Sequence, residues 1–468
     1  MTRLFHLLSY KKSYPKIAIP TFLLLVLLAS CVKEDELTAQ PNISSAVEAG
    51  LKPLNLWEPD LAEDIIYIDP HYTSSPQQGT IEKPYTNFRQ VNWKNKQVIA
   101  LKRGTRLKSE PIVITANDIT LASYGTGSRP VVVINSQKAH AISLNWTGSS
   151  NVTIRDIEVI ANDCVSALIV RDNSQNVQII NCKMSGSTWG IRVLNHIQQI
   201  SIDNTEIFNI LDDGIFIKNT NQIEIKNCYI HHVNQNWRPP STPEEQAGGD
   251  GIQLELCDNW HVHHNVIDRS DNGNKFCFIA NNDNQKNGIL EYNFLKGPNQ
   301  SFAVYLGSGS NLIVRYNHIA APASSPVYSH SKALKVYYNI FDQVSGPLFA
   351  DDAVVYNNLF YLMGTPAIQG KTIVAKNNIF DLNTSRTDRF KVSQEIIEEQ
   401  NLIVKGLPTP GSANGKPFYA DEAKSNYRIT KESACIDKGT PVGISKDIDG
   451  NPVPTGTSPD IGPYEYQP

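Results

Sequence analysis

The sequence predicts an all-β fold in which short strands wind into a parallel solenoid. From Ile119 onward, apolar residues alternate over short stretches and then give way to Asn, Asp or Gly. One marked position recurs at residues 157, 182, 205, 228, 265, 293, 317, 339, 358 and 378, and all but one of the steps fall between 19 and 28 residues. Period-two strands at this spacing are typical of stacked coils, whereas helical repeats would need helix-period segments. A single-stranded right-handed parallel β-helix accounts for the pattern best.

The marked position itself supports this fold. Six successive repeats carry asparagine there, namely Asn265, Asn293, Asn317, Asn339, Asn358 and Asn378. In coils stacked in register, such amides can hydrogen-bond to one another and to the turn backbone. Scattered turn residues would not keep to one column.

Each repeat also has a second strand after a turn, and its alternation separates interior from solvent-facing positions. The inward residues are Leu168 and Val170, Ile191 and Val193, Ile215 and Ile217, Ile252 and Leu254, Phe278 and Ala280, and Val304 and Leu306. One outward column reads Ile169, Arg192, Phe216, Gln253, Ile279 and Tyr305, and the next reads Arg171, Leu194, Lys218, Glu255 and Asn281. The position before the strand reads Ser166, Trp189, Asp213, Asp250, Phe276 and Phe302.

Two Asp-Gly-Ile strand starts stand out in this alignment. Asp213 and Asp250 occupy equivalent places in successive repeats. Stacking would bring their carboxylates one strand spacing apart, roughly 5 Å. Like charges at that distance share a metal ion, share a proton or take separate roles in acid–base chemistry.

The residues around this pair suit a sugar ligand. Aromatic rings beside hydrogen-bonding groups match a sugar's apolar faces and polar rim, and basic residues suit a carboxylated or sulfated sugar. The step from 228 to 265 is 37 residues long, and its loop between Ile230 and Gly251 is expected to form a cleft wall. We therefore expect substrate contacts from Arg171, Arg192, Lys218, Trp189, Phe216, Gln253, Trp237, Arg238 and Tyr305.

The N-terminus has the layout of a signal peptide. Three lysines precede an apolar run that is too short for a comfortable membrane span and ends in Leu28-Ala29-Ser30-Cys31. This ending resembles the lipobox of bacterial lipoproteins, and the following Val32-Lys33-Glu34-Asp35-Glu36 resembles the surface-export signal of Bacteroidota lipoproteins. We expect a signal peptide at 1–30, lipidated Cys31 and a tether at 31–63, and one β-helix domain at 64–468. The protein would then be an outer-membrane lipoprotein, with exposure at the cell surface favoured over an orientation towards the periplasm.

The net charge and the cysteine content further narrow the class of protein. Loss of residues 1–30 would remove four of 42 basic residues and none of the 46 acidic ones, leaving 38 against 46 and a net charge of −8. This charge provides no global basic field for nucleic acid. Six cysteines remain after Cys31 without metal-finger spacing, so we expect buried single thiols. We also expect a monomer.

A family resemblance rests on particular segments. The rungs YNHI, YNIF, NNLF and NNIF, the early segments IIYIDPHYTSSPQQGTIEKPYTNF and VIALKRGTRL, and the closing DIDGNPVPTGTSPDIGPYEY resemble the pectate-lyase-like β-helix superfamily. The resemblance covers roughly residues 64–468 and implies an N-terminal cap, an irregular C-terminal segment and activity on polysaccharides. That scaffold also carries hydrolases, epimerases and binding proteins, so fold alone does not select a reaction.

Three functions remain open. For a polysaccharide lyase, the resemblance implies Ca²⁺ held by Asp212, Asp213, Asp250 and Glu255, with Lys275 or Arg269 as the base and His231 or His232 as less favoured bases. For a glycoside hydrolase, Asp213 and Asp250 would be acid and base, because DDGIFIK resembles the paired-aspartate motif of polygalacturonases. The expected preceding Asn-Thr-Asp and the Gly-His-Gly histidine are, however, replaced by Thr188-Trp189-Gly190 and Gly249-Asp250-Gly251. The third function is a non-catalytic glycan-binding β-helix whose aspartates only shape turns. Elimination of an acidic, uronate-containing polysaccharide is slightly favoured.

Overall fold

The computed structural model describes residues 64–144, 147–234, 249–270, 276–281, 284–297, 302–321, 325–364, 366–383, 389–405 and 412–468. The predicted signal peptide, Cys31 and tether, as well as Trp237, Arg238 and Lys275, lie outside the described residues. Within the described ranges, no helix has the length and apolar content that a bilayer crossing requires.

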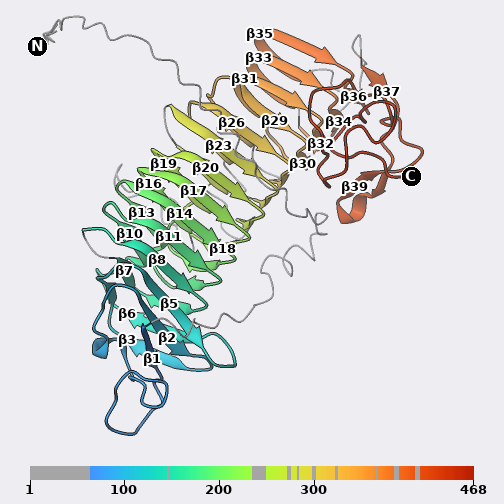
Figure 1. Cartoon of the computed structure of the whole chain (residues 1–468). Helices are drawn as coiled ribbons and strands as arrows, with labels where there is room; N and C mark the ends of the chain where they lie inside the picture. The colour runs from blue at the N-terminus through green and yellow to red at the C-terminus, as the bar shows by residue number, and fades with distance from the viewer. Residues whose placement is uncertain are drawn as a thin grey trace, which may run out of the picture. The chain divides into compact units, whose positions relative to one another are not determined.

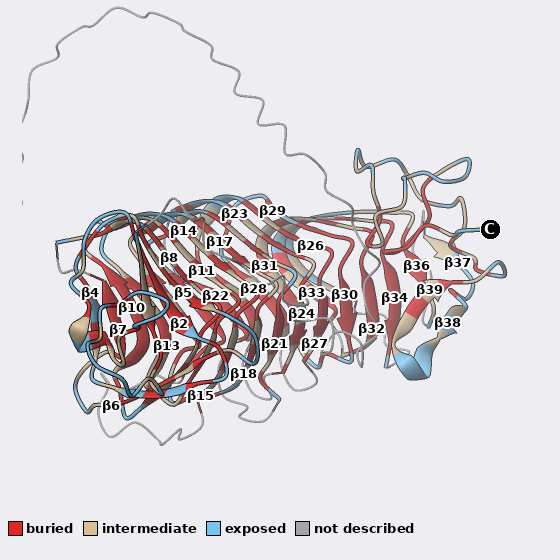
Figure 2. Ribbon diagram, turned by 60° about the horizontal axis from the view of Figure 1, so that its bottom comes forward, coloured by how far each residue is buried: buried red, intermediate tan, exposed pale blue. Residues whose placement is uncertain are grey.

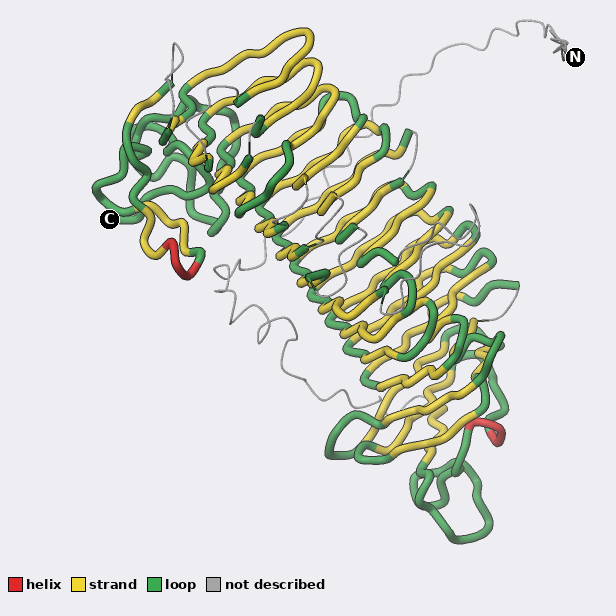
Figure 3. The backbone as a smooth tube through the Cα atoms, turned by 180° about the vertical axis from the view of Figure 1, so that it is seen from behind, coloured by secondary structure: helices red, strands yellow, loops and turns green. Residues whose placement is uncertain are grey.

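The described residues form the predicted right-handed parallel β-helix (Figure 1). Each full coil contributes one strand to each of three faces, and short loops join the strands (Figure 3). The strands of the first face are β4 (Ile112–Ile114), β7 (Ile142–Leu144), β10 (Ser166–Arg171), β13 (Trp189–Leu194), β16 (Ile215–Lys218), β19 (Ile252–Glu255), β22 (Phe278–Ala280), β25 (Phe302–Leu306) and β28 (Ser325–Ser329).

The second face follows the first after a bend in the chain. Its strands are β1 (Asp64–Ile68), β2 (Gln97–Lys102), β5 (Ile119–Tyr124), β8 (Ser150–Arg155), β11 (Gln175–Ile180), β14 (Ile197–Asp203), β17 (Thr220–Lys226), β20 (Asp258–His263), β23 (Gln285–Glu291), β26 (Gly309–Arg315) and β29 (Leu334–Tyr337). The long strands β31 (Leu348–Tyr356), β33 (Ile368–Lys376) and β35 (Phe390–Glu399) continue both faces without the bend.

The third face completes each coil with a shorter strand. Its strands are β3 (Arg106–Ser109), β6 (Val131–Asn135), β9 (Glu158–Asn162), β12 (Lys183–Ser185), β15 (Glu206–Ile210), β18 (Tyr229–Val233), β21 (Val266–Asp268), β24 (Phe294–Lys296), β27 (His318–Ala320), β30 (Ile340–Asp342), β32 (Leu359–Met363), β34 (Ile379–Leu382), β36 (Leu402–Ile403) and β37 (Ala413–Asn414). All three faces pair in parallel from coil to coil.

The core lies inside the coils, and the predicted inward residues form part of it. All twelve of them, from Leu168 to Leu306, are at most 1% exposed. In strands such as β16 and β19, burial follows the alternation, so that intermediate residues separate buried ones (Figure 2). The outward columns also pair as predicted, with Arg192 beside Phe216 and Phe216 beside Gln253. Alternation of side chains across a strand therefore fixed the register correctly.

The predicted asparagine column is a continuous hydrogen-bonded ladder between the second and third faces. The backbone N–H and the Nδ2 group of each asparagine both donate to the Oδ1 atom of the next one, at 2.8–3.0 Å. Asn401 extends the column by one coil. Because these residues are at most 1% exposed, each bond satisfies a polar group that water cannot reach.

The two ends of the solenoid differ from its middle. At the N-terminal end, the short 3₁₀ helix η1 (Phe88–Gln90) is capped by Asn87. At the C-terminal end, β38 (Tyr419–Asp421), η3 (Glu422–Lys424) and β39 (Asn426–Ile429) form an irregular segment with an antiparallel pair. This segment packs on the later coils through a second apolar cluster that includes Tyr316, Tyr338 and Tyr427. The predicted irregular C-terminal segment is confirmed.

The cysteines match the prediction of buried single thiols. Cys164, Cys182, Cys228, Cys257, Cys277 and Cys435 are all buried and carry free thiols. Burial raises the pKa of the Cys182 and Cys228 thiols to about 12. These residues therefore pack as small apolar side chains, and among the described residues they form no disulfide.

Candidate functional site

A ladder of glycines brings the two Asp-Gly-Ile turns together. A Cβ atom on Gly190 would lie 2.3 Å from the carbonyl oxygen of Gly214, and one on Gly214 would lie 2.7 Å from that of Gly251. A Cβ atom on Gly251 would lie 2.5 Å from the carbonyl oxygen of Cys277. Only glycine allows coils to approach this closely, so the residue before each glycine is held directly against the next coil.

Asp213 and Asp250 occupy this position on successive coils, as predicted. The Oδ1 atom of Asp213 accepts the backbone N–H of Asp250 at 2.7 Å, and the Oδ1 atom of Asp250 accepts the backbone N–H of Phe276 at 3.0 Å. Each side chain is only 4% exposed. Both carboxylates therefore cap the turn of the following coil while they lie one coil apart.

The surroundings of Asp213 favour its protonated form. Burial raises its pKa well above the usual 3.8, and the neighbouring charges of Asp250 and Asp212 raise it further. The N–H donated by Asp250 and the charge of Arg269 oppose this rise only in part. Asp213 thus lies close enough to Asp250 for the charge of one carboxylate to act on the other.

Arg269 is a buried residue whose charge acts on Asp213. It directly follows β21, where its backbone N–H donates to the carbonyl oxygen of Lys296 at 2.7 Å. Its side chain is 0% exposed, and its charge acts on Asp213. Arg269 thus lies near enough to act on Asp213 through its charge, but it is buried.

One predicted basic residue stands over aromatic rings next to the pair. The guanidinium of Arg192 lies 4.4 Å from the centre of the Trp189 ring and 5.9 Å from that of Phe216. The charges of Asp212 and Asp213 also act on this guanidinium. Arg192, Trp189 and Phe216 are partly exposed. They thus combine a cation, two rings and the nearby carboxylates on the first face.

A separate ion pair joins the C-terminal ends of β16 and β19. Glu255 accepts from the Nζ atom of Lys218 at 2.5 Å and from Nε2 of Gln253 at 3.2 Å. Glu255 ends β19, five residues after Asp250, which corresponds to about 16 Å of extended strand. The structure therefore does not bring Glu255 to the paired aspartates.

This separation bears on the predicted calcium site. Asp213 and Asp250 each use one oxygen to accept a backbone N–H. Among the residues that the structure describes, Asp212, Asp213, Asp250 and Glu255 do not form a group whose oxygens could hold one ion. The structure therefore separates Glu255 from the other three predicted Ca²⁺ ligands, and Ca²⁺ binding stays a prediction.

Aromatic rings continue along the first face beyond the aspartates. The rings of Phe276 and Phe302 stack at 6.0 Å, and those of Tyr305 and Tyr328 stack at 5.5 Å. Tyr328 in turn stacks on Phe349 at 4.5 Å. Tyr305 lies at the outward position predicted for it. The row of rings, which we call the aromatic strip, extends two coils beyond the repeats that were aligned in the sequence.

The predicted solvent exposure is wrong for part of the first face. Arg171 is 8% exposed, Ile169 is 1% exposed and Ile279 is 6% exposed. All of β10 is buried, from Ser166 to Arg171. Alternation gives the direction of a side chain but does not reveal what covers it, so the early basic residue Arg171 is not an open contact point.

The predicted histidines lie on the third face. His231 and His232 belong to β18, and their Nδ1 atoms are 2.6 Å apart. His231 also contacts the Oε1 atom of Glu206 at 3.2 Å and stacks between Tyr229 and Phe208. His232 is exposed. β18 ends at Val233, shortly before residues 235–248, which lie outside the described residues.

A second cluster was not identified in the sequence. Glu224, His261 and His263 project from neighbouring strands of the second face. The detectable signal was His-Val-His inside a period-two strand, which places both imidazoles on one face. Its glutamate partner lies 37 residues away from His261 in the chain, and only the register links them.

The comparison with protein families agrees with the fold. A family model described as a right-handed β-helix region matches residues 122–295. No curated protein matches the chain in sequence. A solved complex of XylC with xylose is 10% identical, with a TM-score of 0.48, over 86% of this chain and 98% of that one.

Two further solved structures show the same kind of likeness. The A-module of a mannuronan C-5 epimerase from Azotobacter vinelandii is 13% identical, with a TM-score of 0.43, over 68% of this chain and 91% of that one. An alginate lyase of family PL6 is 12% identical, with a TM-score of 0.42, over 74% of this chain and 55% of that one. At these identities the likeness concerns the fold alone.

Proposed function

We propose that the protein is a carbohydrate-active enzyme that cleaves an acidic polysaccharide on the first face. The observation that carries this proposal is the pairing of Asp213 and Asp250 on adjacent coils, with the pKa of Asp213 raised by burial and by its acidic neighbours. A carboxylic acid with a raised pKa keeps its proton to a higher pH and can donate it to a leaving oxygen. Asp250 on the adjacent coil would serve as base or nucleophile.

The flanking residues support an acidic sugar as the substrate. Arg192 offers a planar cation for a carboxylate or sulfate group, and it stands over the rings of Trp189 and Phe216. On the other side of the pair, the aromatic strip from Phe276 to Phe349 offers apolar surfaces to further sugar units. Stacking on such rings is the usual way for a protein to hold the apolar face of a sugar.

Hydrolysis is the route for which the described residues supply both groups. Asp213 would act as the acid and Asp250 as the base or nucleophile. Elimination remains the alternative, and its predicted bases differ in status. Arg269 is 0% exposed, so it acts on Asp213 rather than on a substrate proton, whereas Lys275 lies outside the described residues. A lyase would therefore depend on Lys275, with His232 or His231 as weaker candidates.

A binding role without catalysis is the second candidate function. The observation in its favour is that both aspartates cap backbone N–H groups, which gives each carboxylate a structural task. In that case the first face would hold a glycan through Arg192 and the aromatic rings, and the pair would only shape the turns.

The predicted cellular location completes the proposal. A lipid on Cys31 and the acidic segment after it would hold the protein at the outer membrane, facing the cell surface. An enzyme placed there meets polysaccharides before they enter the cell. Metabolic labelling with a fatty-acid analogue, compared between the wild type and Cys31→Ala, tests this part independently of activity.

One assay separates the three functions. The purified protein is incubated with panels of pectin, alginate, glycosaminoglycan and sulfated galactan, with and without EDTA. We expect new reducing ends without an ultraviolet-absorbing double bond. Product that absorbs in the ultraviolet would instead establish elimination, and its loss on adding EDTA would support the Ca²⁺ prediction. Binding to one of these glycans with neither product would leave the non-catalytic function.

A further inference from the structure

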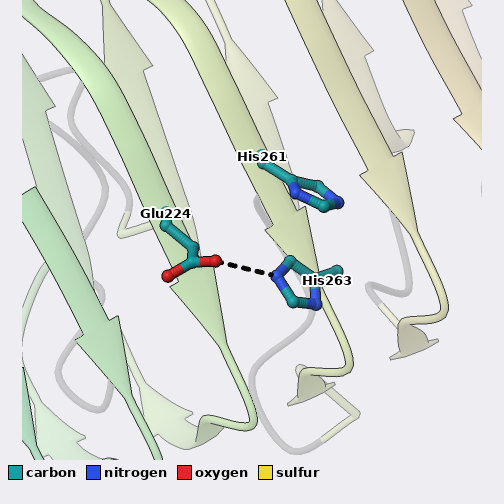
Figure 4. Close-up of side chains that lie close together, drawn as sticks. All are labelled: Glu224, His261 and His263. Carbon is teal, nitrogen blue, oxygen red and sulfur yellow. Dashed lines mark ion pairs between the residues drawn. The ribbon is translucent and has the colours of Figure 1, made fainter. Parts of the chain in front are cut away.

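Three potential metal ligands meet on the outer surface of the second face. Glu224 lies on β17, and His261 and His263 lie on β20 (Figure 4). Glu224 pairs in register with His261, and His263 follows two residues later, so all three side chains leave the sheet on the same side. One ligand atom from each lies within 4.8 Å of the other two.

The spacing of two of these atoms suits a shared ion. Nε2 of His263 is 3.6 Å from Oε1 of Glu224, and this nitrogen is buried without a hydrogen bond among the described residues. Two ligands bound tetrahedrally at about 2.0–2.1 Å from one ion lie about 3.3 Å apart. A distance of 3.6 Å is thus too long for a hydrogen bond but close to the spacing of two ligands on one metal.

The remaining atoms of the three side chains are already held by neighbours. Nε2 of His261 contacts Oε1 of Glu291 at 2.7 Å, which leaves Nδ1 for an ion. Oε2 of Glu224 accepts from Nζ of Lys226 at 2.8 Å and from the hydroxyl of Ser201 at 3.1 Å, which leaves Oε1. A carboxylate behind a histidine ligand is the usual outer support of a metal site because it fixes the tautomer and orientation of the ring.

A further contact orients the second histidine. Nδ1 of His263 lies 2.8 Å from Nδ1 of His264, and the ring stacks against that of His261 with 4.0 Å between centres. The Arg315 guanidinium pairs with Glu291 behind His261. These contacts hold the ring of His263 beside that of His261, with one ligand atom of each within 4.8 Å of the other.

We propose that Glu224, His261 and His263 bind one divalent transition-metal ion of the Zn²⁺ type. Two imidazoles and one carboxylate favour such an ion over Ca²⁺ or Mg²⁺, which prefer oxygen ligands. The side chains of Glu224 and His261 are 39% and 38% exposed, so the ion can reach them. Three protein ligands leave a coordination position for water.

The position of the site suggests what the ion does for the fold. β17 and β20 are adjacent in the sheet, yet the chain between them contains the longest step of the repeat, 37 residues. An ion that joins Glu224 to His261 and His263 would clip together the two coils on either side of this insertion. The site lies on the second face, whereas Asp213 and Asp250 lie two residues before strands of the first face, so it is independent of the proposed catalysis.

The test is a metal titration of the full protein purified without a histidine tag and stripped with EDTA. We expect one Zn²⁺ per chain by calorimetry and by metal analysis after dialysis, with an increase in Tm. Co²⁺ should give the visible absorption bands of a low-symmetry site. Glu224→Gln should weaken Zn²⁺ binding at least tenfold, and His261→Asn and His263→Asn should abolish it together with the Tm increase.

The controls separate this site from unspecific binding. His71→Gln changes an exposed histidine of the N-terminal segment and should leave Zn²⁺ binding unchanged. The Tm of each site variant without metal should match that of the metal-free wild type, which shows that it folds. Failure of the wild type to bind Zn²⁺, or binding that survives both histidine substitutions, would overturn the proposal.

Discussion

At the residue scale, Asp213 has a structural role and a proposed catalytic role, and a substitution can separate the two. Its Oδ1 atom accepts the backbone N–H of Asp250, which satisfies a buried donor of the next coil. Its raised pKa favours the protonated form, which would act as the acid in the proposed reaction. An amide side chain keeps an oxygen acceptor of the same shape but has no acidic proton.

We predict that Asp213→Ala and Asp213→Asn differ in stability. Alanine leaves the N–H of Asp250 unpaired in a buried turn, which costs about 1–3 kcal/mol of unfolding free energy. Asparagine should cost less than half as much because its Oδ1 atom can accept the same bond. Denaturant unfolding of both variants measures the difference, and equal losses would show that the cap contributes nothing.

At the element scale, the asparagine ladder ties the turns of successive coils together. In the middle of the ladder, the Oδ1 atom of Asn317 accepts two bonds from Asn293. Its Nδ2 atom donates to the carbonyl oxygens of Leu290 and Arg315, as well as to the next asparagine. Removing this one side chain therefore leaves several buried groups without partners.

Asn317→Ala should lower the unfolding free energy by about 2–5 kcal/mol, because buried unpaired groups cost about 1–3 kcal/mol each. The matched control is Asn311→Gly, which removes an exposed asparagine that bonds Asn287 in another row and keeps the positive φ of 56° accessible. We expect the control to lose less than about 1 kcal/mol. Similar losses at the two positions would mean that the ladder is not what holds the turns.

The C-terminal segment is expected to respond to pH. Burial raises the pKa of Asp447 to about 6 and that of Glu465 to about 7, although both accept backbone N–H bonds that lower them. An acid with a raised pKa in the folded state binds its proton more tightly there than when unfolded. Its contribution to stability is therefore complete below its ordinary pKa and is lost as the pH rises through the folded value.

Glu465→Gln should reduce the loss of stability between pH 5 and pH 8, since the amide does not titrate. Unfolding midpoints of the wild type and of this variant at several pH values give the two slopes. Glu432→Gln, at an exposed position of the same segment, serves as the control and should keep the slope of the wild type. If Glu465→Gln has that slope as well, Glu465 does not carry the pH dependence.

Much of the arrangement of strands and turns could be predicted from the sequence. The alternation identified all twelve inward residues, and the column of asparagines marked one turn through seven coils when Asn401 is included. Periodicity encodes these features because each repeat places the same residue in the same environment. The segments that cover outward-facing residues do not follow the repeat. The pattern therefore did not predict that Arg171 and Arg269 are buried.

At the scale of the whole molecule, the first face joins features that are distant in sequence. Arg192 and its two rings lie on one side of the paired aspartates, and the aromatic strip continues on the other side as far as Phe349. A polymer that runs along the stacked coils would meet a cation, the acid pair and then rings. The placement of Asp213 beside Asp250 was predictable from equivalent repeat positions, whereas the metal cluster needed the register of β17 against β20.

Arg192→Ala should raise KM for the acidic polysaccharide about 10- to 100-fold, because a hydrogen bond to a charged group contributes about 1.5–3 kcal/mol. Added salt should raise KM of the wild type more than that of the variant, since ions screen the lost attraction. Arg89→Ala, which removes an exposed cation of the N-terminal segment, is the control. An unchanged KM in Arg192→Ala would remove this residue from the substrate site.

The most direct test of the whole account is the turnover of Asp213→Asn and Asp250→Asn on whichever acidic polysaccharide the wild type cleaves. Loss of general acid–base catalysis should reduce kcat about 100- to 10,000-fold in each variant. The unfolding free energy should stay within about 1 kcal/mol of the wild type, because asparagine retains the turn cap. Turnover near the wild-type rate in both folded variants would contradict the assignment of Asp213 and Asp250 as the catalytic pair.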